Sequence, residues 1–71
     1  MNNIRRKRIR DVLIRLEELL KTIFREERDA FENMPEGIQQ SANGMESEDA
    51  QSNLEAAIDC IAEAITYLED I

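Results

Sequence analysis

Apolar residues recur along two segments of the chain with the spacing of a helix that packs against another helix. In both segments the spacing alternates between four and three residues. The first series is Ile9, Leu13, Leu16, Leu20 and Ile23, and the second is Leu54, Ile58, Ile61, Ile65 and Leu68. Ala57 and Ala64 accompany the second series and would let another helix approach closely. The pattern predicts two long helices, at about 4–33 and 46–70.

Residues 34–45 separate the two series and read as a hinge. The single Pro and both Gly of the chain lie between positions 35 and 44. Pro35 is disfavoured inside a helix, and Asn33 ahead of it can cap a short turn. Asn43-Gly44 indicates a chain reversal, with Asn43 or Ser47 as the N-cap of the second helix. The sequence therefore predicts one all-α domain over residues 1–71, an antiparallel helical hairpin.

Both predicted helices carry apolar faces that are too wide for a two-helix unit. On the second helix the apolar arc covers roughly 200°, whereas one partner helix covers about half of that. A second hairpin would cover the remainder. We therefore expect a homodimer that forms a four-helix bundle through both faces, although a helix of another protein would also serve.

Charge is divided sharply along the chain. All nine basic residues lie within positions 1–28, and the remaining 43 residues carry eleven acidic residues and no basic one. Attraction between the two halves predicts four facing pairs if the hinge centres near residue 40. These are Arg10 with Asp70, Arg15 with Glu63 or Tyr67, Lys21 with Asp59, and Arg25 with Glu55. In that register residues 5–8 extend beyond the end of the second helix.

The composition argues against an enzyme. The chain has no His and one Cys, so neither a disulfide framework nor a Cys/His metal cluster is expected. Glu46, Glu48 and Asp49 lack the EF-hand pattern, and Cys60 has no basic neighbour that would activate it. No acid/base pair or nucleophile motif is present. We expect no catalytic residue, no cofactor, no metal and no small-molecule substrate.

The same features suggest where the protein is found. No apolar run reaches the ~20 residues needed to span a membrane, and no apolar stretch of 7–15 residues follows the basic start, so we do not expect a secretory signal. A lone Cys fits a reducing compartment. The sequence therefore predicts a cytoplasmic protein that does not enter a membrane.

Three segments are candidates for partner binding. A basic segment could contact phosphates, although no aromatic residues are interleaved with it and the net charge of the chain is −7. It comprises Arg5, Arg6, Lys7, Arg8 and Arg10. Apolar residues of the hinge could dock onto a protein, namely Phe31, Met34, Pro35 and Ile38. The acidic face of the second helix could imitate nucleic acid.

Three short stretches resemble a family of small uncharacterised helical proteins of bacteriophages, prophages and gut bacteria. They are the IRRKRI start, the AFENMPE segment at residues 30–36 and the LEAAI segment at residues 54–58. The family has no known activity, so the resemblance implies a phage or prophage setting, in a bacterial host cell, and no chemistry.

The leading hypothesis is a protein–protein interaction module, a small regulator or inhibitor of an unidentified host or phage protein. The alternative is a nucleic-acid-binding accessory protein that uses the basic segment, or an acidic nucleic-acid mimic. A structural assembly component would share the fold.

Overall fold

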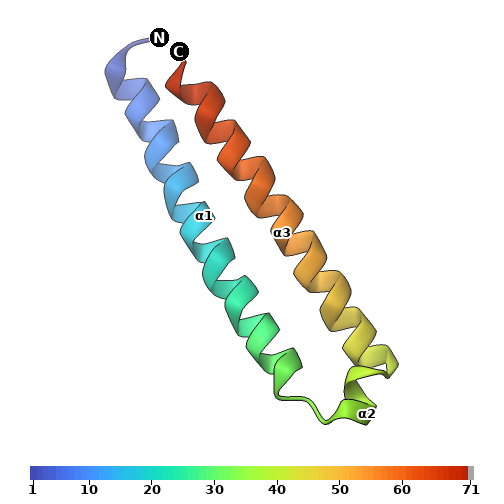
Figure 1. The fold of residues 1–71 in the computed structure, drawn as a ribbon. Coiled ribbons are helices and arrows are strands. Elements are labelled where there is room, and N and C mark those ends of the chain that lie inside the picture. The colour runs from blue at the N-terminus through green and yellow to red at the C-terminus, as the bar shows by residue number, and fades with distance from the viewer. Residues whose placement is uncertain (71) are drawn as a thin grey trace.

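The computed structural model describes residues 1–70 and consists of two long helices joined by a short one. The helices are α1 (Asn3–Glu32), α2 (Glu36–Gln39) and α3 (Ala42–Glu69). Helices α1 and α3 lie side by side and antiparallel, so the two ends of the chain meet at the end opposite the hinge (Figure 1). The molecule measures 54 × 14 × 11 Å. The predicted all-α helical hairpin is confirmed.

Local sequence explains both ends of α1. The Asn2 side chain accepts a hydrogen bond from the Arg5 backbone N–H at 2.9 Å and caps the first turn. At the other end, Asn33 is the C-cap, and its N–H donates to the carbonyls of Asp29 and Phe31. Pro35 has an extended backbone and lacks an N–H, so the helix cannot continue through it.

The hinge is shorter than the sequence predicted. Helix α3 begins at Ala42 rather than near residue 46, and its N-cap is Ser41 rather than Asn43 or Ser47. The Asn43-Gly44 pair does not reverse the chain, because Gly44 lies inside α3 and no residue of the described part has a positive φ. The reversal occurs at residues 33–41, where the carbonyl of Pro35 accepts from the N–H groups of Ile38 and Gln39 and starts α2.

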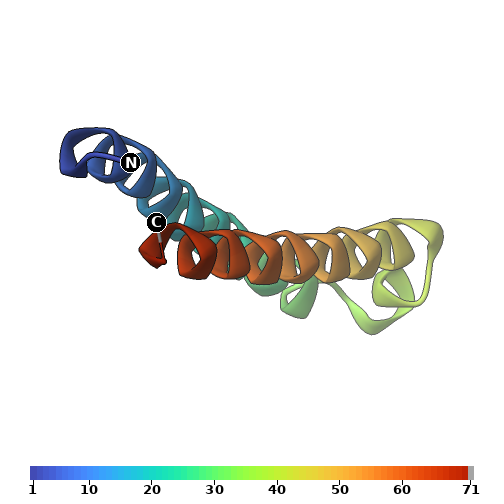
Figure 2. The same cartoon turned by 90° about the horizontal axis from the view of Figure 1, so that it is seen from above.

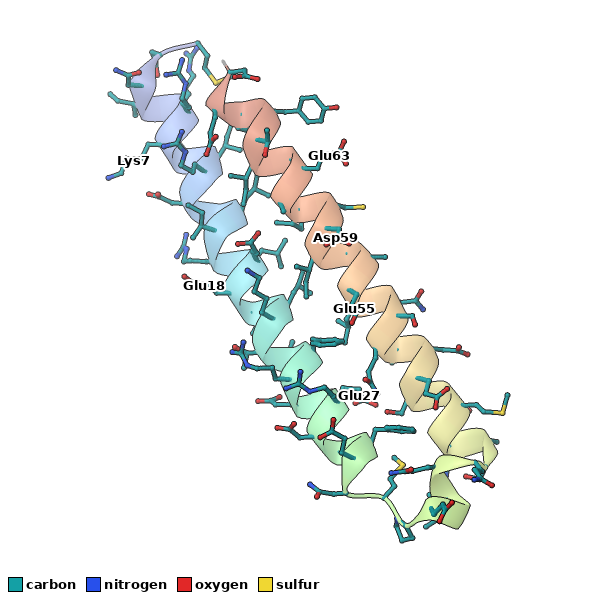
Figure 3. The ribbon with its side chains drawn as sticks, in the orientation of Figure 1. Lys7, Glu18, Glu27, Glu55, Asp59 and Glu63 are labelled. Carbon is teal, nitrogen blue, oxygen red and sulfur yellow. The ribbon has the colours of Figure 1, made fainter. Side chains whose placement is uncertain are left out.

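One interhelical hydrogen bond fixes the register. The Ser47 hydroxyl donates to Glu27 Oε1 at 2.8 Å, so Glu27 lies level with Ser47. The predicted hinge centre near residue 40 would instead place Glu27 level with Asn53. Figure 3 shows Glu27 between the two helices. The predicted register is therefore wrong by six residues, about 9 Å along the helix axis. Equal steps of seven residues then place Leu20 level with Leu54, and Leu13 level with Ile61.

The predicted charge pairs are also wrong. Within residues 1–70, none of the four facing pairs forms an ion pair. Lys21 instead pairs with Glu17 in its own helix at 3.6 Å, and Arg28 lies 3.8 Å from its neighbour Asp29. Exposed ion pairs contribute only about 0–1 kcal/mol, so they yield to the packing of apolar and small residues.

The hairpin has no enclosed core. Among residues 1–70 no hydrophobic side chain is fully buried, and the buried residues are Gly44 and Ser47 near the hinge. The facing row of α1 is half-buried and mixes apolar with charged residues, in the order Arg6, Arg10, Leu13, Glu17, Leu20, Phe24, Glu27 and Phe31. Seen from above, α1 crosses behind α3 at an angle (Figure 2). One such contact covers only part of the apolar surface.

Candidate protein-binding surface

Five large apolar residues of α1 form an exposed row, which we call the outer stripe. They are spaced by three and four residues and are 38–55% exposed. The outer stripe consists of Ile9, Val12, Leu16, Leu19 and Ile23. At about 100° per residue it lies roughly 80° around α1 from the row of Leu13, Leu20 and Phe24 that faces α3. Helix α1 therefore carries two apolar rows, and α3 covers one of them.

Helix α3 offers no comparable row. Its large apolar residues are half-buried against α1, apart from Met45 and Tyr67, which are 61% and 67% exposed at opposite ends of the helix. The predicted interface residues of α3 all belong to the half-buried set, namely Leu54, Ala57, Ile58, Ile61, Ala64, Ile65 and Leu68. The unpartnered apolar surface of the hairpin is thus concentrated on α1.

The predicted interface residues of α1 divide between its two rows. Leu13 and Leu20 are half-buried towards α3, whereas Ile9, Leu16 and Ile23 are exposed. Val12 and Leu19, which complete the outer stripe, were absent from the predicted interface. Their three- and four-residue spacing from Ile9, Leu16 and Ile23 marks them in the sequence as widening the apolar face on that side.

A groove lies at the N-terminal end of the outer stripe. It has a volume of about 610 Å³ and is lined by Met1, Arg5, Arg8, Ile9, Val12 and Leu13. Its lining is almost wholly apolar, and Arg5 and Arg8 are the two basic residues that contribute to it. Such a groove suits an apolar side chain that has a carboxylate beside it.

The predicted phosphate-contact residues do not form one surface. Arg5, Lys7 and Arg8 are exposed, whereas Arg6 and Arg10 are half-buried in the row that faces α3. The Arg6 guanidinium donates to Asn3 Oδ1 at 3.2 Å and to the Met1 carbonyl. The sequence predicted that residues 5–8 extend beyond the end of the second helix. This prediction is wrong, because the start of α1 lies beside the end of α3 (Figure 1). Three basic side chains point to solvent rather than five.

The hinge residues proposed for docking are partly used for folding. Phe31 and Met34 are half-buried, and the Phe31 carbonyl accepts a hydrogen bond from Gln39 Nε2 at 3.0 Å. Pro35 and Ile38 are exposed, Ile38 by 44%. The exposed apolar area at the hinge is therefore much smaller than the outer stripe.

Four further features of residues 1–70 bear on the kind of site. Within residues 1–70, no three His, Cys, Asp or Glu side chains are placed to hold a metal ion. No helix of the described part is long and apolar enough to cross a membrane. Cys60 is exposed. The outer face of α3 carries exposed Glu55, Asp59 and Glu63, with no basic residue in that helix.

Comparison with known proteins adds no relative. A scan against protein-family models, a search of curated proteins and a search of solved structures each return no match to this chain. Inference about its role therefore depends on its surface.

Proposed function

We propose that the protein is a non-enzymatic protein–protein interaction module that binds its partner through the outer stripe of α1. The observation that supports this is a continuous row of five large apolar side chains, exposed on a hairpin that has no enclosed core within residues 1–70. Contiguous exposed apolar surfaces on small proteins are typical of interaction sites. An amphipathic helix of another chain is the simplest ligand for such a row.

The resemblance to phage and prophage proteins gives this module a biological role. A hairpin that offers one exposed apolar row suits a regulator or inhibitor that occupies a surface of a larger protein. We propose that this target is a host or phage protein in the bacterial cytoplasm.

The test compares three affinity baits in a bacterial lysate: the wild type, Leu19→Glu and Ile14→Glu. Leu19 is 55% exposed in the outer stripe, and Ile14 is 38% exposed on the opposite side of α1, so the two variants add the same charge to different faces. Proteins retained by the wild type and by Ile14→Glu but lost from Leu19→Glu support the proposal. Retention that is identical for all three baits argues against it.

A second candidate is binding of nucleic acid at the basic segment, favoured by exposed Arg5, Lys7 and Arg8 on one short stretch of helix. Three neutralised phosphates imply a log–log salt slope near −2 to −3. A mobility-shift assay at low salt should compare the triple Gln variant of these residues with a charge-matched control. That control replaces exposed Arg15, Lys21 and Arg25. A shift lost only in the first variant would favour nucleic acid over protein as the partner.

A further inference from the structure

We infer that the occupant of the outer stripe is a second copy of this chain, with its α1 antiparallel to the first. This inference rests on the proposed function, because it names a second copy as an occupant of the same surface. A host or phage target would then compete with that copy for the outer stripe. In the resulting two-fold dimer the two outer stripes face each other, and the two hinges lie at opposite ends of a four-helix assembly. Because the outer stripe lies roughly 80° around α1 from the row that faces α3, helix α3 of each copy lies beside the α1 pair.

The hairpin exposes more surface than a compact monomer of its mass, and the surplus is about what one partner buries in an ordinary interface. A compact monomer of 8.2 kDa is expected to expose about 4,500 Å², and this chain exposes 5364 Å². The surplus is close to the ~800 Å² that each partner buries in a standard protein–protein interface. The outer stripe supplies an apolar centre for it, about 21 Å long from Ile9 to Ile23.

Charge selects the antiparallel orientation. The hinge end, residues 26–49, carries eight acidic residues and one basic residue. The open end, residues 1–15 together with 60–70, carries six basic and four acidic residues. A parallel dimer would bring two strongly negative hinge ends together. The antiparallel dimer brings each hinge end beside an open end of positive charge, which complementary interfaces require.

The groove at the end of the outer stripe agrees with this orientation. If Leu16 faces Leu19 of the second copy, then Val12 faces Ile23 of the second copy and the two apolar rows remain in contact. Arg8, which lines the groove, then lies within one residue of the level of Glu26 of the second copy and on the same side of the α1 pair. Ile23 of the second copy then supplies the apolar side chain, and Glu26 supplies the neighbouring carboxylate, that suit the groove.

The first measurement is the mass in solution, from light scattering coupled to size exclusion between 1 and about 200 µM. We expect a dimer that Leu19→Glu weakens by about 100-fold or more, because the two-fold axis places both new charges in the centre of the interface. Ile14→Glu, on the opposite side of α1, should leave the dimer intact. Far-UV circular dichroism of each variant establishes that the hairpin is still folded.

The second measurement tests orientation and leaves the outer stripe unaltered. Spin labels are placed singly at Lys7→Cys or Glu18→Cys, with Cys60→Ser in both. Lys7 and Glu18 lie on the side of α1 away from α3 and opposite the outer stripe (Figure 3). In the antiparallel dimer the two labels at position 7 are separated by about 30 Å along the axis, whereas those at position 18 lie almost level.

The outcomes separate the inference from the proposed function. A wild type that stays monomeric to 200 µM overturns the second-copy inference, while loss of captured proteins from the Leu19→Glu bait would still support the binding surface. A dimer with similar distances at both label positions overturns the antiparallel orientation alone. A dimer unaffected by folded Leu19→Glu overturns the second-copy inference, because association would then use another surface.

Discussion

Gly44 is the position where one added methyl group tests the hinge most directly. It is buried in the first turn of α3, against the backbone of α2. A Cβ built there would lie 2.6 Å from Gln39 Cα and closer still to the carbonyl group of that residue. These are backbone atoms and cannot rotate away, so Gly44→Ala requires α2 to move by about 1 Å.

The cost of Gly44→Ala follows from three contributions. Replacing a helical Gly by Ala stabilises by about 0.5–1 kcal/mol. Overpacking costs about 1–3 kcal/mol, and displacement of α2 strains the hydrogen bond from Gln39 to the Phe31 carbonyl, worth about 0.5–1.5 kcal/mol. The packing cost exceeds the gain in helix propensity, and we expect the free energy of unfolding to fall by about 1–3 kcal/mol. For a domain of this size, each 1 kcal/mol lowers Tm by about 4–8 °C.

Gly37→Ala is the matched control. Gly37 lies in α2, has no atom within 4 Å of an added Cβ and has no positive φ. Its substitution should leave stability unchanged or raise it by up to about 1 kcal/mol. Urea titrations followed by circular dichroism, at one fixed protein concentration, measure both variants. A Gly44→Ala protein as stable as Gly37→Ala would refute the packing of α2 against α3.

Three further predictions test the contact between the long helices. Ser47→Ala should cost about 1–2 kcal/mol in urea titrations, and a double-mutant cycle should remove that cost in a Glu27→Leu background, where no carboxylate loses its donor. Ile61→Asp should leave the chain largely unfolded by circular dichroism, because it puts an unpaired charge in the half-buried row. Cysteines at positions 20 and 54, without the natural Cys, should form a disulfide, and their failure to do so would contradict the register.

The sequence was sufficient to predict the helices and their arrangement. Helical spacing of apolar residues identified α1 and α3, and Pro35 marked where α1 must end. The register was not predictable in the same way. It depends on a tight approach at Gly44 and a side-chain bond between Ser47 and Glu27, both of which require the hinge to be known to the residue. A hinge three residues shorter than expected, 33–41 in place of 34–45, moved every facing pair.

The binding surface was predicted only in part, and the reason is geometric. When apolar residues cover a wide arc, their spacing does not determine which part of the arc faces the partner helix. The predicted series combined Leu13 and Leu20, which face α3, with Leu16 and its neighbours in the outer stripe. Charged Glu27 continues the seven-residue spacing of Leu13 and Leu20, whereas Glu17 lies in the facing row although the apolar spacing did not place it there.

The separation of basic and acidic residues needs a cause other than the one first inferred. It was expected to align α1 with α3 through facing pairs, yet none of those pairs forms an ion pair within residues 1–70. What the fold does with the separation is to gather negative charge at the hinge end and to leave the open end positive. A charge difference between the ends of a rod affects how two rods approach each other, because it acts over about a Debye length of 8–10 Å. Under the proposed association, the charge pattern therefore orients the dimer, while apolar and small residues fix the hairpin.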